Sequence, residues 1–178
     1  MIIFLDIDGV LNGGRNGFNT VSEYVKARKQ FEEDFGITFL LPDINVLPFV
    51  GCINKYIEQN GENSIKAVLS STWRHDSENI ELLNNLLYKK GLKDIEFIID
   101  KTDRINDCST AKDRGNQINR WVRKNKPNGF VILDDEFSTM IHKGRLYKTN
   151  TFLGFRDEHV EGFLNHINKW RINENKGN

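Results

Sequence analysis

Residues 1–12, MIIFLDIDGVLN, decide the fold of this chain. A continuous apolar run from Ile2 to Leu5 ends in two carboxylates, Asp6 and Asp8, followed by Gly9. Such a run, which does not alternate with polar residues, is typical of a strand buried on both faces of a helix-covered parallel sheet. The polar residues that follow it then lie at the carboxyl edge of the sheet, where open α/β folds bind ligands.

Further apolar runs of the same kind occur at 67–69, 97–99 and 130–133, and a shorter one at 146–148 is expected to be an edge strand. Stretches of helical period lie between or after them, at 43–59, 77–90, 112–124 and 157–170. This alternation predicts an α/β fold: a three-layer, doubly wound parallel sheet. Gly61 and Gly91 fall where helix ends favour a positive φ.

Residues 13–42 interrupt the pattern with a Gly-rich loop and a charged helix, VSEYVKARKQFEEDFG. We expect a small lid-like insertion over the end of the first strand, too small for a full cap domain. The chain is expected to form one domain over 1–172, with a frayed tail at 173–178.

Composition excludes several classes of function. Lys plus Arg equals Asp plus Glu, at 25 each, so no overall basic field favours non-specific binding to nucleic acid or membrane. Cys52 and Cys108 lack metal-ligand spacing and are expected to be reduced thiols of a cytoplasmic protein. Neither a signal peptide nor an apolar stretch of about 18 residues is present, so no membrane contact is expected.

Polar residues follow three of the buried runs and are expected to meet at one edge of the sheet. They are Asp6 and Asp8 after the first run, Ser70, Ser71, Thr72, Trp73 and Arg74 after the second, and Asp134 and Asp135 after the fourth. The helix before the fourth run begins with two cations, Lys112 and Arg114. The four histidines have no metal-ligand spacing.

Buried carboxylates are unfavourable unless they are paired or bind a metal, and an oxygen-rich site of this kind suits Mg²⁺. Asp6 is then placed to attack phosphorus and form an aspartyl-phosphate, while Asp8 protonates the leaving oxygen and later deprotonates water. The predicted metal ligands are Asp6, Asp8 and the Asp134–Asp135 pair, of which either member completes the site.

Phosphate binding is assigned to the Ser70 hydroxyl and to the following loop, Ser71 and Thr72. Arg114 is preferred over Lys112 as the catalytic cation because its planar fork grips two oxygens, and Lys112 stays open as a substrate-binding alternative. Arg74 is predicted to hold a further phosphate with Trp73 stacked on a base. In the alternative interpretation, Trp73 packs in the core and Arg74 pairs with an Asp of the site.

Four segments in order, FLDIDGVLN, LSSTWR, Lys112–Arg114 and VILDD, resemble the motifs of haloacid dehalogenase (HAD) superfamily phosphatases. LSSTWR, RGNQINRW, VILDDE and FLGF are most similar to the small HAD domains of Swiss Army knife RNA-repair proteins, which resemble polynucleotide 3′-phosphatases. The resemblance implies a Mg²⁺-dependent phosphomonoesterase acting on an RNA or DNA end or on a nucleotide. It carries over the roles already given to Asp6, Asp8, Ser70, Arg114 and the Asp134–Asp135 pair.

Two other functions stay open. One is a phosphatase for an unrelated small metabolite, whose anionic body would be selected by Arg15, Lys26, Arg28 and Lys29 of the insertion. The other is a catalytically idle phosphate-binding module. The intact pair Asp6 and Asp8 argues against the idle module, because a binder needs no nucleophile beside an acid/base.

Overall fold

The computed structural model describes residues 1–12, 21–36, 41–75, 78–103 and 111–171. Its strands are β1 (Ile2–Leu5), β2 (Lys66–Leu69), β3 (Ile98–Lys101), β4 (Phe130–Asp134) and β5 (Leu146–Lys148). The α-helices are α1 (Val21–Phe35), α2 (Asp43–Asn60), α3 (Asn79–Lys89), α4 (Ala111–Asn125) and α5 (Asp157–Trp170). Two 3₁₀ segments, η1 (Thr72–His75) and η2 (Phe137–Arg145), follow β2 and β4.

The five strands form one sheet in the order β3-β2-β1-β4-β5, and every neighbouring pair is parallel. β1 is central, with its last residue Leu5 in register with Leu69 of β2 and Leu133 of β4. From β1 the chain builds one half of the sheet through β2 and β3 and then the other through β4 and β5. The predicted doubly wound parallel sheet is therefore confirmed, with its switch point between β1 and β4.

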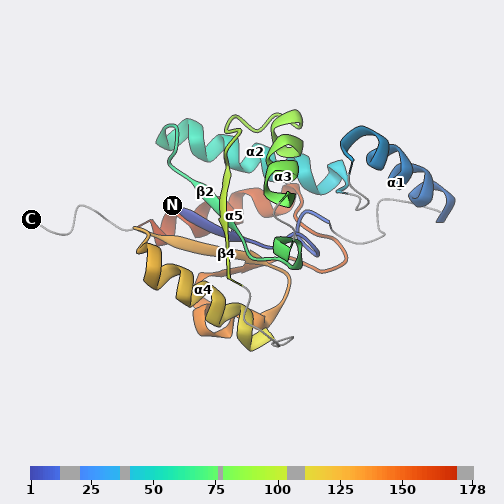
Figure 1. Cartoon of the computed structure of the whole chain (residues 1–178). Helices are drawn as coiled ribbons and strands as arrows, with labels where there is room; N and C mark the ends of the chain where they lie inside the picture. Colours follow the sequence, from blue (N-terminus) through green and yellow to red (C-terminus); the bar gives the residue numbers. More distant parts are fainter. Residues whose placement is uncertain (13–20, 37–40, 76–77, 104–110, 172–178) are drawn as a thin grey trace, which may run out of the picture.

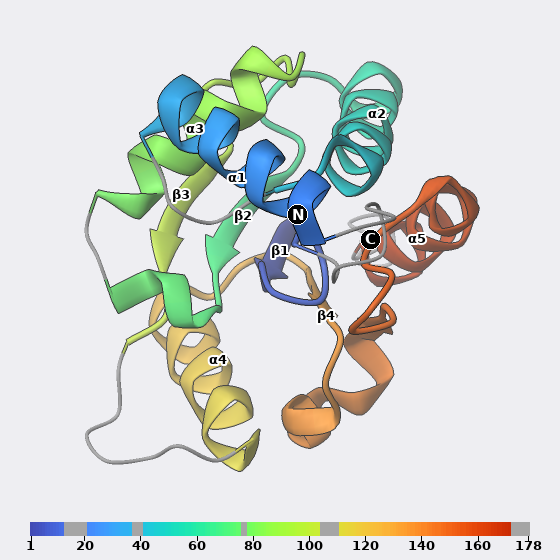
Figure 2. The same ribbon diagram turned by 90° about the vertical axis from the view of Figure 1, so that its right-hand side faces the viewer.

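Helices cover both faces of the sheet, as Figures 1 and 2 show, with α2 and α3 on the side opposite α4. The alternation of side chains along β1 explains the two layers: Ile3 and Leu5 join the large core with α2, α3 and α5. Phe4, between them, points to the other face and meets Trp121 of α4 edge to face, with ring centroids 5.4 Å apart. Both cores are made of buried, largely apolar side chains. Their packing holds in place the strands whose ends carry the polar residues.

The sequence placed most elements within two residues of their observed bounds, and the differences lie at the sheet edge. The strand predicted at 97–99 begins at Ile98 and runs to Lys101, because an edge strand tolerates the exposed Asp100 that the apolar pattern left out. η2, which packs against α4, was not predicted. Gly61 and Gly91 adopt the expected positive φ, at 91° and 97°.

The predicted charged helix of the insertion is α1, and it packs beside the end of α3. Phe31 is buried, and the Phe35 ring lies under the ammonium groups of Lys89 and Lys90, at 5.3 and 5.7 Å. Residues 13–20 and 37–40 of the insertion, the tail 172–178 and Cys108 lie outside the described residues. Cys52 is a buried free thiol. None of the described helices combines the length and apolar character needed to cross a membrane.

Candidate active site

Three polar side chains stand in one row at the carboxyl edge of the sheet. Asp6, Ser70 and Asp134 each follow the last apolar residue of β1, β2 or β4, and these apolar residues are in register. The backbone ladder continues through the row, since the Asp6 amide donates to the Leu133 carbonyl at 3.0 Å. Because side chains alternate along a strand, this row points to the same face as Phe4, the face covered by α4. The register therefore sets the site beside the start of α4.

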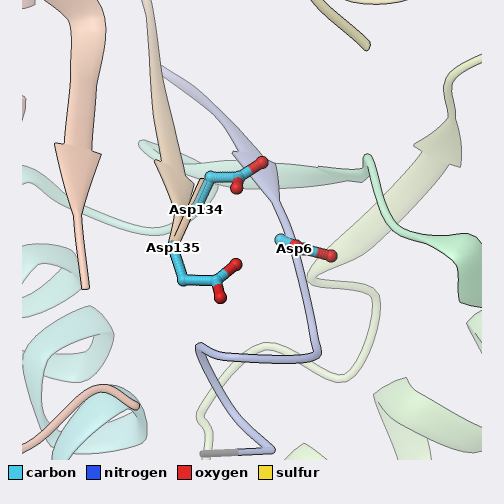
Figure 3. Close-up of side chains that lie close together, drawn as sticks. All are labelled: Asp6, Asp134 and Asp135. Atoms are coloured by element: carbon cyan, nitrogen blue, oxygen red, sulfur yellow. The ribbon is translucent and has the colours of Figure 1, made fainter. Parts of the chain in front are cut away.

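The centre of the site is a cluster of three buried carboxylates, Asp6, Asp134 and Asp135. One oxygen from each lies within 4.8 Å of the others, and Figure 3 shows them at the ends of β1 and β4. This donor set fits Mg²⁺, a hard cation bound through carboxylate oxygens, better than metals that prefer His or Cys. Asp134 and Asp135 both belong to the cluster, and Asp8 is not part of it among the described residues.

Arg114 supplies the positive charge of the cluster. Its Nη1 donates to Asp6 Oδ2 at 2.8 Å and to Asp134 Oδ2 at 2.7 Å. Burial works against the charged guanidinium, but the two carboxylates outweigh it and raise the pKa of Arg114. The side chain of Lys112, the alternative cation, lies outside the described residues.

Among the described side chains, one guanidinium stands against three buried carboxylates and does not balance their charge. Burial raises the pKa of Asp6 from its ordinary 3.8 toward neutrality, even though Arg114 lowers it. Burial also raises the pKa of Asp134, again against the effect of Arg114. The site thus holds unfavourable negative charge that a further cation would relieve.

Asp8, two residues after Asp6, is exposed and has hydrogen-bond partners of its own. The Asn12 Nδ2 group donates to Asp8 Oδ1 at 2.9 Å, and the Trp73 Nε1 group donates to Asp8 Oδ2 at 3.2 Å. Ile7, between the two carboxylates, is fully buried. Asp6 is buried as well, whereas Asp8 is exposed. Their roles can differ because their surroundings differ.

Gly9 lets the first loop pass close to Asp135. Its φ is +75°, and a Cβ built there would lie 2.1 Å from Asp135 Oδ2. The Thr149 hydroxyl donates to the Gly9 carbonyl at 2.7 Å and so helps to hold the loop in this position. Any side chain at position 9 would displace a carboxylate of the cluster.

The loop after β2 borders the cluster with hydroxyl groups. Ser70 Oγ is buried and has no hydrogen-bond partner among the described residues. The Ser71 side chain lowers the pKa of Asp6, and its hydroxyl lies 3.5 Å from the Trp73 amide, for which it is the acceptor. Thr72 is exposed at the start of η1. A buried hydroxyl without a partner is unfavourable, and among the described residues Ser70 leaves its donor unused at this edge of the sheet.

Trp73 and Arg74 belong to this loop and hold it in place. Trp73 is buried in the large core, with 7% of its surface exposed, so it presents no face on which a base could stack. The expectation that Trp73 stacks on a base is therefore wrong, and the alternative core position holds. Arg74 Nη1 donates to the Ser71 carbonyl at 2.6 Å and braces the turn.

Two hydrogen bonds of the site, both to Asp8, were not predicted from the sequence. Asn12 stands four residues after Asp8, and the tight turn around Gly9 was a signal that its amide returns to the carboxylate. Trp73 is 65 residues from Asp8, and no local pattern indicated their contact.

The fold and site define a class: Rossmann-like α/β proteins with an acidic centre at the carboxyl edge of a parallel sheet. A family described as "HAD domain in Swiss Army Knife RNA repair proteins" matches residues 2–160. Because this match covers most of the chain, the chain belongs to that family, as the motifs from FLDIDGVLN to VILDD predicted. Neither the curated proteins nor the solved structures yielded a match.

Proposed function

We propose that this protein is a Mg²⁺-dependent phosphomonoesterase that acts through an aspartyl-phosphate on Asp6. Its substrate is a phosphorylated nucleic-acid end, preferably a 3′-phosphate, or a nucleotide. One observation carries the proposal: Asp6 directly follows the central strand, clusters with Asp134 and Asp135, and pairs with Arg114 at 2.8 Å.

Asp6, Asp134 and Asp135 would hold the metal, and the excess of carboxylate charge over Arg114 favours its binding. Mg²⁺, when bound, would neutralise charge on the phosphoryl group and keep Asp6 ionised. The Asp8 side chain lies outside the cluster, so we assign its carboxylate to proton transfer, and Asp8 stays a proposed ligand of the metal as well.

In the first half of the reaction, an Asp6 oxygen attacks phosphorus and the bond from phosphorus to the leaving alcohol breaks. The proton of Asp8 goes to the leaving oxygen. In the second half, a water attacks the phosphorus, Asp8 takes the proton of that water, and the bond from phosphorus to Asp6 breaks. Phosphate leaves, and Asp8 is protonated for the next turnover.

Arg114 and the loop after β2 would hold the oxygens of the phosphoryl group. The guanidinium that bridges Asp6 and Asp134 offers further N–H groups to the phosphate. The Ser70 hydroxyl, which has no described partner, donates to the phosphate together with the amides of Ser71 and Thr72. Lys112 is the alternative source of charge, from the same turn of α4.

Membership in a family of RNA-repair domains supports the nucleic-acid substrate. We further propose one domain over 1–172, in which 13–42 is a lid-like insertion. The packing of α1 beside the end of α3 supports a position at the margin of the fold. The buried free thiol of Cys52 is in keeping with a reducing, cytoplasmic compartment.

A substrate panel tests the proposal. With Mg²⁺, kcat/KM is measured for 3′-phosphorylated and 5′-phosphorylated oligonucleotides, mononucleotides and sugar phosphates, with Asp6→Asn as the inactive control. We expect the highest value for the 3′-phosphorylated oligonucleotide and no turnover by the variant. A preference for sugar phosphates would replace the substrate with a small metabolite, and binding without turnover would leave a phosphate-binding module.

A further inference from the structure

The indole of Trp73 contacts both the hydrophobic core and the Asp8 carboxylate. Its ring is anchored in the large core, and its Nε1 group reaches the exposed carboxylate of Asp8 at 3.2 Å. An indole nitrogen is a donor only, so its polarity at this contact is fixed. A buried group thus holds one oxygen of an exposed carboxylate, whose other oxygen accepts from Asn12.

The turn that carries Trp73 is fixed at several points. The Asn79 side chain donates to the Trp73 carbonyl at 2.7 Å, and Arg74 donates to the Ser71 carbonyl at 2.6 Å. The turn after β2 therefore holds the Trp73 indole in place against the Asp8 carboxylate.

We infer that Trp73 is a positioning residue for proton transfer: its N–H group, with the Asn12 amide, holds the Asp8 carboxylate toward the leaving oxygen. The two donors use one site on each oxygen of a group with about four lone-pair sites, which leaves room for the transferred proton. This inference rests on the proposed function. It also deepens it, because a positioned acid is needed only for a poor leaving group.

The consequence is a substrate whose leaving group is an aliphatic alcohol, such as a ribose hydroxyl. Such an alkoxide must receive a proton as its bond to phosphorus breaks, whereas p-nitrophenolate leaves without one. Loss of the acid's orientation should therefore slow the first kind of substrate selectively. General acid–base catalysis contributes about 10²- to 10⁴-fold in rate, so the selective loss is large enough to measure.

Trp73→Phe removes the N–H group and keeps an aromatic ring in the core. Trp121→Phe is the matched control: Trp121 is also buried and donates its Nε1 group to a carboxylate, Asp100 Oδ2, at 2.6 Å. For each variant, kcat/KM is measured with a nucleoside monophosphate and with p-nitrophenyl phosphate, since this ratio reports the step in which the leaving group departs. Thermal unfolding is recorded alongside.

We expect Trp73→Phe to lower kcat/KM about 10-fold or more on the nucleotide and about twofold at most on p-nitrophenyl phosphate. Trp121→Phe should leave the ratio of the two substrates unchanged. An equal loss on both substrates, or no loss on either, would overturn the role of Trp73. Should Trp73→Phe fail to fold, Asn12→Ala removes the other donor without touching the core, and the same outcomes apply. A wild-type protein inactive on both substrates and on a 3′-phosphorylated oligonucleotide would instead remove the proposed function, and the positioning role with it.

Discussion

Arg114 Nη1 lies 2.8 Å from Asp6 Oδ2, and the same nitrogen lies 2.7 Å from Asp134 Oδ2. The guanidinium comes from the first turns of α4 and crosses to the ends of β1 and β4, so it joins the two halves of the sheet at their switch point. It is thus a structural tie, and in the proposed reaction it would also supply positive charge to the transferring phosphoryl group. Each of these roles can be tested separately.

Arg114→Met should destabilise the protein strongly, because it leaves Asp6 and Asp134 buried without their counter-ion. Breaking a buried pair in this way costs about 3–5 kcal/mol in the free energy of unfolding. Lys93→Met, which breaks the exposed pair of Lys93 with Glu58, should cost about 0–1 kcal/mol. Denaturant unfolding in chelator measures both, and equal effects would contradict a structural role for Arg114.

Asp6→Asn should stabilise the metal-free protein at neutral pH while it abolishes turnover. The pKa of Asp6 is raised by burial, so the fold favours its protonated form. Its contribution to stability is present in full below the unfolded pKa of 3.8 and is lost as pH rises toward neutrality. The asparagine variant does not ionise and escapes this loss.

The measurement is the difference in free energy of unfolding between Asp6→Asn and wild type, in chelator, at about pH 4 and about pH 8. This difference should grow with pH. A pH-independent difference for Asp6→Asn would mean that Asp6 ionises without cost in the fold.

Mg²⁺ should raise the thermal stability of the wild type through the carboxylate cluster. A ligand that binds only the folded state at 100 times its Kd adds about 2.7 kcal/mol. Asp134→Asn and Asp135→Asn should each reduce the shift, and the larger reduction identifies the stronger metal ligand. Glu158→Gln, at an exposed position of α5, should leave it intact. A full shift in both aspartate variants would place the metal elsewhere.

Gly9→Ala should disrupt the site beyond the strain of its backbone. Gly61→Ala is the control, because Gly61 has a similar positive φ of 91° but nothing within 4 Å of a Cβ. A positive φ of this kind at a residue with a Cβ costs roughly 1–3 kcal/mol, which both variants should show. Only Gly9→Ala should also lose the thermal shift by Mg²⁺, since its Cβ would meet Asp135 at 2.1 Å. Retention of that shift would show that the loop relaxes.

The sequence was sufficient for the sheet and for much of the site because both follow from local patterns. Buried parallel strands are marked by unbroken apolar runs such as Ile2 to Leu5, and parallel strands bring their carboxyl ends to one edge. Asp6, Ser70 and Asp134 were therefore placed together by strand position alone. η2 was not predicted because short 3₁₀ segments such as Phe137–Arg145 carry no such pattern.

Contacts made across the site depend on how the layers pack, and the sequence did not provide them. The Trp73 side chain was open to two interpretations, since a large aromatic after a strand fits either a core or a binding surface. In the structure, its ring packs in the core, and its Nε1 group donates to Asp8. The choice between Arg114 and Lys112 likewise needs the orientation of α4 against the sheet, and α4 brings Arg114 to Asp6.

In the proposed reaction Asp6 forms a covalent phosphoryl intermediate. Wild type and Asp6→Asn are mixed with a 3′-phosphorylated oligonucleotide and Mg²⁺, quenched in acid within a single turnover, digested, and analysed by mass spectrometry. We expect phosphate on the peptide that contains Asp6 in the wild type only, with Asp6→Asn retaining less than about a tenth of the activity. Turnover without a labelled Asp6 peptide, or substantial activity in the variant, would contradict this proposal.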